Sequence, residues 1–193
     1  MMKYPTYMLI ALACSFLTPP ANTDAADIKV GDPAPEFSAM DDQGSLWKSS
    51  DHVGKKILVV YFYPADMTGG CTAQACGYRD NFEKLADKDV AVVGVSGDTV
   101  SSHQAFKKAH DLNFTLLADV DGSVAKKFGV PITEGEKTVK KVILDVEHVL
   151  TRNVTAKRWT FVIDKDGKIA YKDDAVKAKQ DPETILAAVD KLK

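Results

Sequence analysis

The stretch Ile57-Leu-Val-Val-Tyr-Phe-Tyr63-Pro-Ala-Asp-Met-Thr-Gly-Gly-Cys71 decides the fold of this chain. The unbroken apolar and aromatic run from Ile57 to Tyr63 is typical of a central strand covered on both faces. A loop rich in proline and glycine follows it and ends at Cys71, where a helix is predicted to begin. A thiol at the start of a helix faces backbone N–H groups and the positive end of the helix dipole, which favour its thiolate form.

Strands and helices alternate on both sides of this stretch. Apolar residues recur every three or four positions from Thr72 to Ala86, which predicts one helix. The other predicted elements are a hairpin over 38–48, a buried strand over 90–95, a helix from Ser101 or Ser102 to His110, a strand over 114–117, a helix over 124–128, a strand-rich insertion over 139–154, paired strands over 158–163 and 168–171, and a last helix capped by Asp181.

This order predicts an α/β protein with a mixed central sheet and helices on both faces, which describes the thioredoxin-like fold. In such open sheets the active site lies beyond the carboxyl ends of the strands. The strand that ends at Tyr63 delivers Cys71 to that edge.

Composition is that of an ordinary soluble domain. The chain has 193 residues, of which 45% are hydrophobic and 27% charged, and this length favours a single domain. The formal net charge of −2 gives no reason to expect nucleic acid or an anionic membrane surface as a partner.

The first 26 residues read as a secretory signal that precedes a domain spanning 27–193. Lys3 is followed by the apolar run Met8 to Leu17 and then by small residues up to Ala26. The run is shorter than the roughly 20 residues of a membrane span. We therefore expect export to the periplasm or another extracytoplasmic compartment, with cleavage after Ala25 or Ala26. The alternatives are an N-terminal arm of the domain, or a lipid anchor on Cys14.

Two cysteines, Cys71 and Cys76, remain once residues 1–26 are removed. In an exported protein such a pair is commonly a structural disulfide. On one helix, however, positions five apart lie about 8.6 Å from each other, beyond the roughly 7 Å that a disulfide tolerates. A bond between them requires the helix to unwind locally, so we expect a bond that forms and breaks during function.

The segment Tyr63-Pro-Ala-Asp-Met-Thr68-Gly-Gly-Cys71-Thr-Ala-Gln-Ala-Cys76 resembles the active-site segment of the peroxiredoxins. Its five-residue spacing is similar to that of the bacterioferritin-comigratory, or PrxQ, branch. Two further stretches resemble the entry motif and the later arginine segment of that family: Gly31-Asp-Pro-Ala-Pro-Glu-Phe37 and Arg158-Trp-Thr-Phe-Val-Ile-Asp-Lys-Asp-Gly-Lys168.

The resemblance implies a role for each matching residue. Cys71 would be the peroxidatic cysteine, and Cys76 the resolving one. Thr68 would hydrogen-bond the peroxide and the thiolate, Pro64 would shield the pocket, and Arg158 would stabilise the thiolate and polarise the peroxide. The chain departs from the branch at Gly69, where proline is usual, and at Met67, where asparagine is common.

The same resemblance implies an atypical two-cysteine peroxidase that reduces hydrogen peroxide and alkyl hydroperoxides. It implies no metal, haem or flavin cofactor. A thioredoxin-like dithiol protein would reduce the disulfide, and a monomer is expected, with no nucleic acid partner and no membrane span.

Two other classes of function compete with this interpretation. An exported copper-binding chaperone with a thioredoxin fold would use Cys71, Cys76 and His148, but such proteins resemble Cys-x3-Cys, which places both sulfurs on one side of a helix. A thiol–disulfide oxidoreductase would resemble Cys-x2-Cys, which the sequence lacks. A purely structural domain remains if Cys71 is inert.

Overall fold

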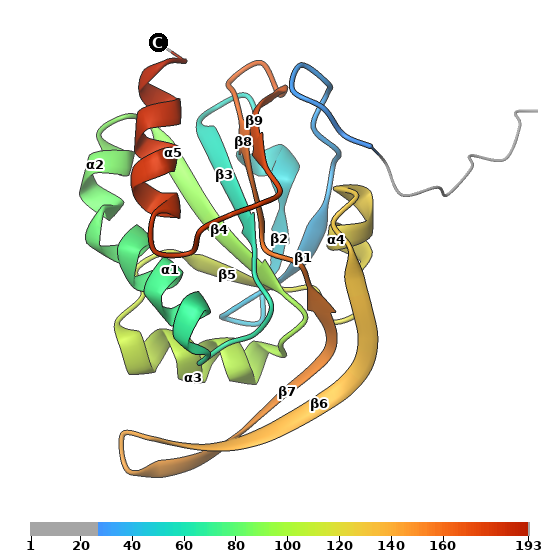
Figure 1. Cartoon of the computed structure of the whole chain (residues 1–193), viewed down its shortest axis with the longest axis vertical. Helices are drawn as coiled ribbons and strands as arrows, with labels where there is room; N and C mark the ends of the chain where they lie inside the picture. The colour runs from blue at the N-terminus through green and yellow to red at the C-terminus, as the bar shows by residue number, and fades with distance from the viewer. Residues whose placement is uncertain (1–26, 193) are drawn as a thin grey trace, which may run out of the picture.

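A mixed seven-stranded sheet forms the centre of the molecule in the computed structural model, which describes residues 27–192 (Figure 1). In spatial order the strands are β2 (Leu46–Lys48), β1 (Ser38–Asp41), β5 (Thr115–Ala118), β4 (Val90–Ser96), β3 (Ile57–Phe62), β8 (Trp159–Ile163) and β9 (Ile169–Asp173). Strands β3, β4 and β5 run parallel to one another, and their flanking neighbours β1 and β8 run antiparallel to them. The edge strands β2 and β9 pair antiparallel with β1 and β8.

Strand β3 is buried along its whole length, as its apolar run predicts. Successive side chains of a strand point to opposite faces of the sheet, so β3 contributes to two separate hydrophobic cores. Leu58, Val60 and Phe62 face one of them, whereas Val59 and Tyr61 face the other. The second core also contains Cys71, so the thiol is packed into the body of the protein.

Helices cover both faces of the sheet, which confirms the predicted fold class. The helices that pack on the core containing Cys71 are α1 (Gly69–Asp80), α2 (Phe82–Ala86), α3 (Val100–His110) and α5 (Asp181–Asp190). Helix α4 (Ser123–Lys127) packs on the opposite core, and a short 3-10 helix, η1 (Ser49–Asp51), follows β2. Figure 1 shows α1 and α5 side by side on one flank of the sheet, with α4 on the other.

The predicted insertion is a long hairpin of β6 (Ile132–Ile143) and β7 (Val146–Ala156), which projects from the body below α3 in Figure 1. It is a two-stranded sheet of its own. Ile143 and Leu150 are buried against Ala105 of α3, with Met67 of the loop between β3 and α1 packed on the same cluster. The hairpin therefore reaches the loop that precedes Cys71.

Two predicted helix boundaries were wrong. The helix expected over 72–86 is two helices that meet at Asn81, whose side chain donates a hydrogen bond to the Gly77 carbonyl and competes with the regular backbone pattern. Helix α3 begins at Val100 because Thr99, rather than either serine, caps it by accepting a hydrogen bond from the Ser102 backbone N–H.

Asp181 is also placed differently from the prediction. It is the first residue of α5, and Gln180 precedes it as the cap without a side-chain hydrogen bond. The carboxylate of Asp181 is buried and engaged elsewhere.

The predicted signal at residues 1–26 lies outside the described residues. Within residues 27–192, no helix is long and apolar enough to cross a membrane.

Candidate active site

Cys71 lies in the first turn of α1, directly beyond the carboxyl end of β3. Thr68 precedes the helix in an extended conformation, and its carbonyl accepts the first helical hydrogen bond from the Thr72 N–H at 2.8 Å. The Cys71 residue is only 1% exposed. Because the first backbone N–H groups of a helix have no partner within the helix, they give the surroundings of this sulfur a positive potential.

Arg158 supplies a full positive charge at the same point. Strand β8 pairs antiparallel with β3, and Trp159 lies opposite Phe62, so Arg158 sits beside the loop that leaves β3. Its Nη2 donates a hydrogen bond to Cys71 Sγ at 3.1 Å. The structure thus brings together two residues 87 positions apart that the sequence assigned to one site.

A polar network holds this arginine in place. The other terminal nitrogen of Arg158, Nη1, donates to Gln74 Oε1, and Gln74 Nε2 donates to Asp181 Oδ2 at 2.7 Å. The same carboxylate oxygen accepts from the Tyr78 hydroxyl at 2.6 Å and from the Thr160 hydroxyl at 3.0 Å. Burial raises the pKa of Asp181, although these three hydrogen bonds oppose the shift.

Sequence reasoning missed Gln74 and Asp181. Gln74 had a usable signal, since a residue three positions after Cys71 lies on the same side of a helix. Asp181 had none, because its partners on α1 are more than a hundred positions away.

A second buried network anchors the loop between β3 and α1. Asp66 Oδ1 accepts a hydrogen bond from the Tyr63 hydroxyl at 2.7 Å, and Asp66 Oδ2 lies 2.8 Å from His103 Nδ1. The backbone N–H of Asp66 donates to Asp98 at 3.0 Å. The residue after β3, a residue just beyond β4 and a residue of α3 are thereby tied to the loop that carries Thr68.

Burial and charge perturb these groups strongly. Burial raises the pKa of Asp98 to about 6, and the nearby Asp66 carboxylate adds to the shift. Burial by itself would lower the pKa of His103, but the charge and hydrogen bond of Asp66 outweigh it, so the pKa of His103 is raised. Burial and the Asp66 charge also raise the pKa of Tyr63.

Thr68 and Pro64 flank the same loop. Pro64 is half-buried and follows β3 within two residues. Thr68 is exposed, and its hydroxyl donates to the Ala65 carbonyl at 3.0 Å. Between them, Met67 adopts a left-handed backbone with φ of 58°, a conformation that costs energy for a residue with a Cβ and is often found at functional sites.

Cys76 is half-buried in the same continuous helix, and both cysteines are free thiols. Helix geometry separates their Cα atoms by about 8.6 Å, so α1 must unwind locally before they can bond. The arrangement can activate one thiol and keep a second in reserve.

Comparison with known proteins identifies the family and the relatives of this chain. The family model described as the AhpC/TSA family matches residues 30–172. Peroxiredoxin Bcp of Escherichia coli is 40% identical over 159 residues, which cover 82% of this chain and 94% of the relative. The chain belongs to the AhpC/TSA family. Its relatives within that family are peroxiredoxins of the Bcp and PrxQ kind, as the cysteine spacing predicted.

Further relatives agree with this placement. Peroxiredoxin Bcp of Bacillus subtilis is 39% identical over 152 residues, covering 79% of this chain and 88% of the relative. Among solved structures, peroxidoxin BcpB from Mycobacterium tuberculosis superposes with a TM-score of 0.72 at 30% identity, over 86% of this chain and 99% of that one. The thioredoxin-like fold is therefore confirmed independently of the motif.

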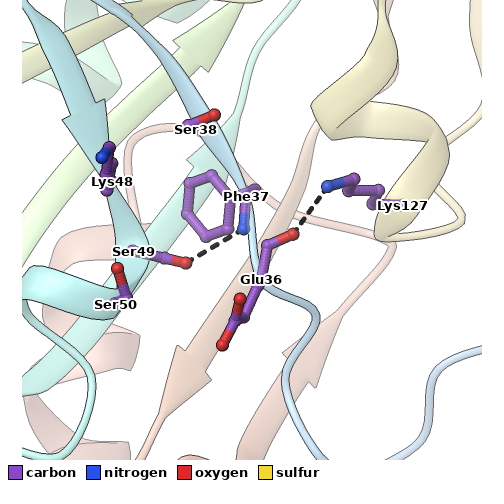
Figure 2. Close-up of a pocket in the computed structure, with 7 residues that line it drawn as sticks. All are labelled: Glu36, Phe37, Ser38, Lys48, Ser49, Ser50 and Lys127. Carbon is purple, nitrogen blue, oxygen red and sulfur yellow. Dashed lines mark hydrogen bonds between the residues drawn. The ribbon is translucent and has the colours of Figure 1, made fainter.

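The copper-binding alternative finds no support in residues 27–192, where no group of three or more His, Cys, Asp or Glu side chains is arranged to hold a metal ion. His148 lies on the projecting strand β7. A surface hollow does exist around Phe37 and Lys127, where Lys127 donates to the Glu36 carbonyl, but none of the peroxiredoxin site residues lines it (Figure 2).

Proposed function

We propose that this peroxiredoxin reduces hydrogen peroxide and organic hydroperoxides at Cys71. The observation that carries the proposal is the 3.1 Å hydrogen bond from Arg158 to a buried sulfur at the start of α1. A free thiol has a pKa near 8.5, so little of it is ionised at neutral pH. A guanidinium and a helix N-terminus at the sulfur both favour the negative charge that attack on a peroxide requires.

The first step transfers one oxygen. The Cys71 thiolate attacks the nearer peroxide oxygen, the O–O bond breaks, and the leaving oxygen departs as water or an alcohol after taking up a proton. The sulfur, oxidised by two electrons, becomes a sulfenic acid. Charge on the leaving oxygen grows as the O–O bond breaks, so fixed donors stabilise that transition state most. Arg158 is such a donor, and the buried position of Cys71 keeps bulk water from the sulfur.

The second step closes the cycle within one chain. The Cys76 thiol attacks the Cys71 sulfenic acid, an S–S bond forms, and water leaves. Because both residues lie in α1, this step needs local unwinding of the helix. A second peroxide that reaches the sulfenic acid first oxidises it to a sulfinic acid and stops turnover.

An external dithiol protein of the thioredoxin type then restores both thiols. Its first thiolate attacks the Cys71–Cys76 bond to form a mixed disulfide, which its second thiol resolves. This partner gives two electrons and two protons for each peroxide reduced. Coupling to purified thioredoxin-like proteins, with each candidate's thiol loss measured, identifies the donor.

The decisive experiment mixes the reduced protein with substoichiometric hydrogen peroxide and follows thiol loss by stopped flow and by mass. We expect oxidation far faster than that of free cysteine, ending in a Cys71–Cys76 disulfide. Cys71→Ser should abolish this reaction. Cys76→Ser is the matched control, since it should keep the fast first oxidation, stop turnover with dithiol proteins and accumulate sulfinic acid. Oxidation of the wild-type protein no faster than that of an ordinary thiol would refute the peroxidase mechanism.

We also propose that residues 1–26 direct export and that residues 27–193 act outside the cytoplasm as a monomer. Expression of the full-length chain, fractionation and mass measurement of the product test the first point. A product that begins at Ala26 or Asp27 and lies outside the cytoplasm supports it, whereas an uncleaved cytoplasmic chain refutes it. Light scattering of the purified product tests the second.

A further inference from the structure

The carboxylate of Asp181 joins two helices and a strand at one oxygen. Oδ2 accepts hydrogen bonds from Gln74 and Tyr78 of α1 and from Thr160 of β8. The residue is 2% exposed, and its other oxygen, Oδ1, has no hydrogen-bond partner. Burying a carboxylate with one oxygen unpaired costs free energy. This cost suggests that the contact serves a function beyond stabilising the fold.

Helices α1 and α5 also approach each other closely beside this carboxylate. A Cβ added to Gly77 would lie 2.8 Å from Cγ of Pro182, closer than real contacts of this kind allow. Only glycine therefore fits at the residue directly after Cys76. The hydrogen bonds and this close contact together fasten to α5 the part of α1 that carries the cysteines.

Gln74 lies between Cys71 and Cys76, so no unwinding that joins the two sulfurs can leave it in place. Unwinding must break its hydrogen bond to Asp181. We infer that Asp181 is a positioning residue that latches α1 to α5, and that this latch sets how readily the helix opens for disulfide formation. The inference rests on the proposed function, because it concerns the second step of that cycle.

The latch also bears on the first step. Gln74 bonds Asp181 through Nε2 and Arg158 through Oε1, so Asp181 orients the amide that holds the guanidinium beside Cys71. Loss of the carboxylate therefore acts on the two steps in opposite directions. Oxidation of Cys71 becomes slower because Arg158 is less well held, and disulfide formation becomes faster because α1 opens more easily.

The test compares Asp181→Ala with Thr160→Val in the reduced full-length protein. Asp181→Ala removes the carboxylate and all three of its hydrogen bonds, whereas Thr160→Val removes only the one that joins β8 to α5 and survives when α1 unwinds. A contact present in both states shifts no equilibrium between them. Stopped-flow fluorescence gives the rates of the two steps separately, and mass spectrometry gives the fraction of sulfinic acid after excess peroxide.

For Asp181→Ala we expect disulfide formation to be about tenfold faster, the factor that a hydrogen bond to a charged group is worth. Less sulfinic acid should form, the first oxidation should slow, and the α1 amides should exchange faster with deuterium. Asp181→Asn, which keeps an acceptor but removes the charge, should restore part of the wild-type balance. Thr160→Val should leave the rate of disulfide formation unchanged, because its hydrogen bond is present in both states of α1. The exposed α5 change Glu183→Gln should leave both rates unchanged.

If Asp181→Ala does not fold, Tyr78→Phe tests the same latch, since it deletes only the hydroxyl that ties α1 to Asp181. Faster disulfide formation in Tyr78→Phe than in Thr160→Val supports the latch. Wild-type rates for disulfide formation in Asp181→Ala, or equal effects of Tyr78→Phe and Thr160→Val, overturn it. These results are distinct from failure of the proposed function, in which the wild-type protein itself shows no rapid oxidation of Cys71.

Discussion

Replacing His103 by leucine should destabilise the protein far more than an average core substitution. His103 and Asp66 are both fully buried, and His103 Nδ1 lies 2.8 Å from Asp66 Oδ2. Two unit charges at that distance attract by about 6 kcal/mol at an effective dielectric constant of about 20. Desolvation offsets part of this attraction, and breaking a buried pair by removing one partner costs about 3–5 kcal/mol. His103→Leu leaves the buried Asp66 side chain without its imidazole partner, with the Tyr63 hydroxyl still donating to it.

The size of the loss should depend on pH, because it includes the charge of His103. The pKa of His103 is raised above its usual 6.5, so its contribution to stability is fully present below pH 6.5 and is lost as the pH rises through the folded-state value. Above the folded-state pKa of His103 the pair becomes an ordinary hydrogen bond worth about 1 kcal/mol. The cost of His103→Leu should therefore shrink as the pH rises from about 6.5 through that folded-state pKa.

Asp98 faces the same network and must be separated from this effect. The pKa of Asp98 is raised from 3.8 to about 6. Its contribution to the free energy of unfolding is therefore lost as the pH rises from about 3.8 to about 6, and it is essentially constant above that range. Urea unfolding of the wild-type and His103→Leu proteins at several pH values above 6.5 therefore reports on His103. The matched control is the double variant Asp66→Asn/His103→Leu, which removes both charges and should recover more than half of the lost stability.

Two results would refute this reasoning. A loss below about 1 kcal/mol near pH 6.5 would mean that Asp66 and His103 do not form an ion pair in solution. A loss that is independent of pH would mean that His103 stabilises the protein by packing alone. In either case the loop before Thr68 would be held by something other than this pair.

Four further changes test the site and its support. Arg158→Met should slow oxidation of Cys71 by about a hundredfold by removing a donor to the transition state, with retained speed in stopped flow arguing against that role. Gly69→Pro should raise the free energy of urea unfolding by about 0.5–1 kcal/mol, since Thr68 already has the extended backbone that must precede proline; a loss would show that the position is strained. Leu150→Ala should lower it by about 2–5 kcal/mol if the hairpin is packed as observed, whereas a free arm would tolerate the change. Thr68→Val should slow the first oxidation about tenfold and Thr68→Ser should not, and equal rates would exclude the hydroxyl.

Local patterns predicted the elements that position the thiol. The apolar run of β3, the proline and glycine loop and the spacing of apolar residues after Cys71 are signals within one segment, and each is present in the structure. The break at Asn81 escaped prediction because no glycine or proline marks it. The apolar spacing continues from Tyr78 to Phe82, while the Asn81 side chain turns back onto the helix.

Asp181 shows why the supporting residues could not be found in the same way. Aspartate before proline at the start of a helix is a sound local signal for a cap. Here the carboxylate instead receives donors from α1 and β8, which reach it only through the tertiary fold. The local preference of aspartate for capping the helix is overridden because several buried donors bond to the same carboxylate oxygen. The buried pair of Asp66 and His103 is a similar case, since the two residues stand 37 positions apart and share no motif.

The orientation of Thr68 adds a constraint that the family resemblance alone did not contain. A hydroxyl has one proton to donate and two lone pairs with which to accept. In this structure the proton of Thr68 is directed at the Ala65 carbonyl, so lone pairs remain free. A peroxide beside Cys71 would therefore donate its own proton to Thr68 while Arg158 donates to the peroxide oxygens. That division of roles favours a protonated hydroperoxide as the bound form.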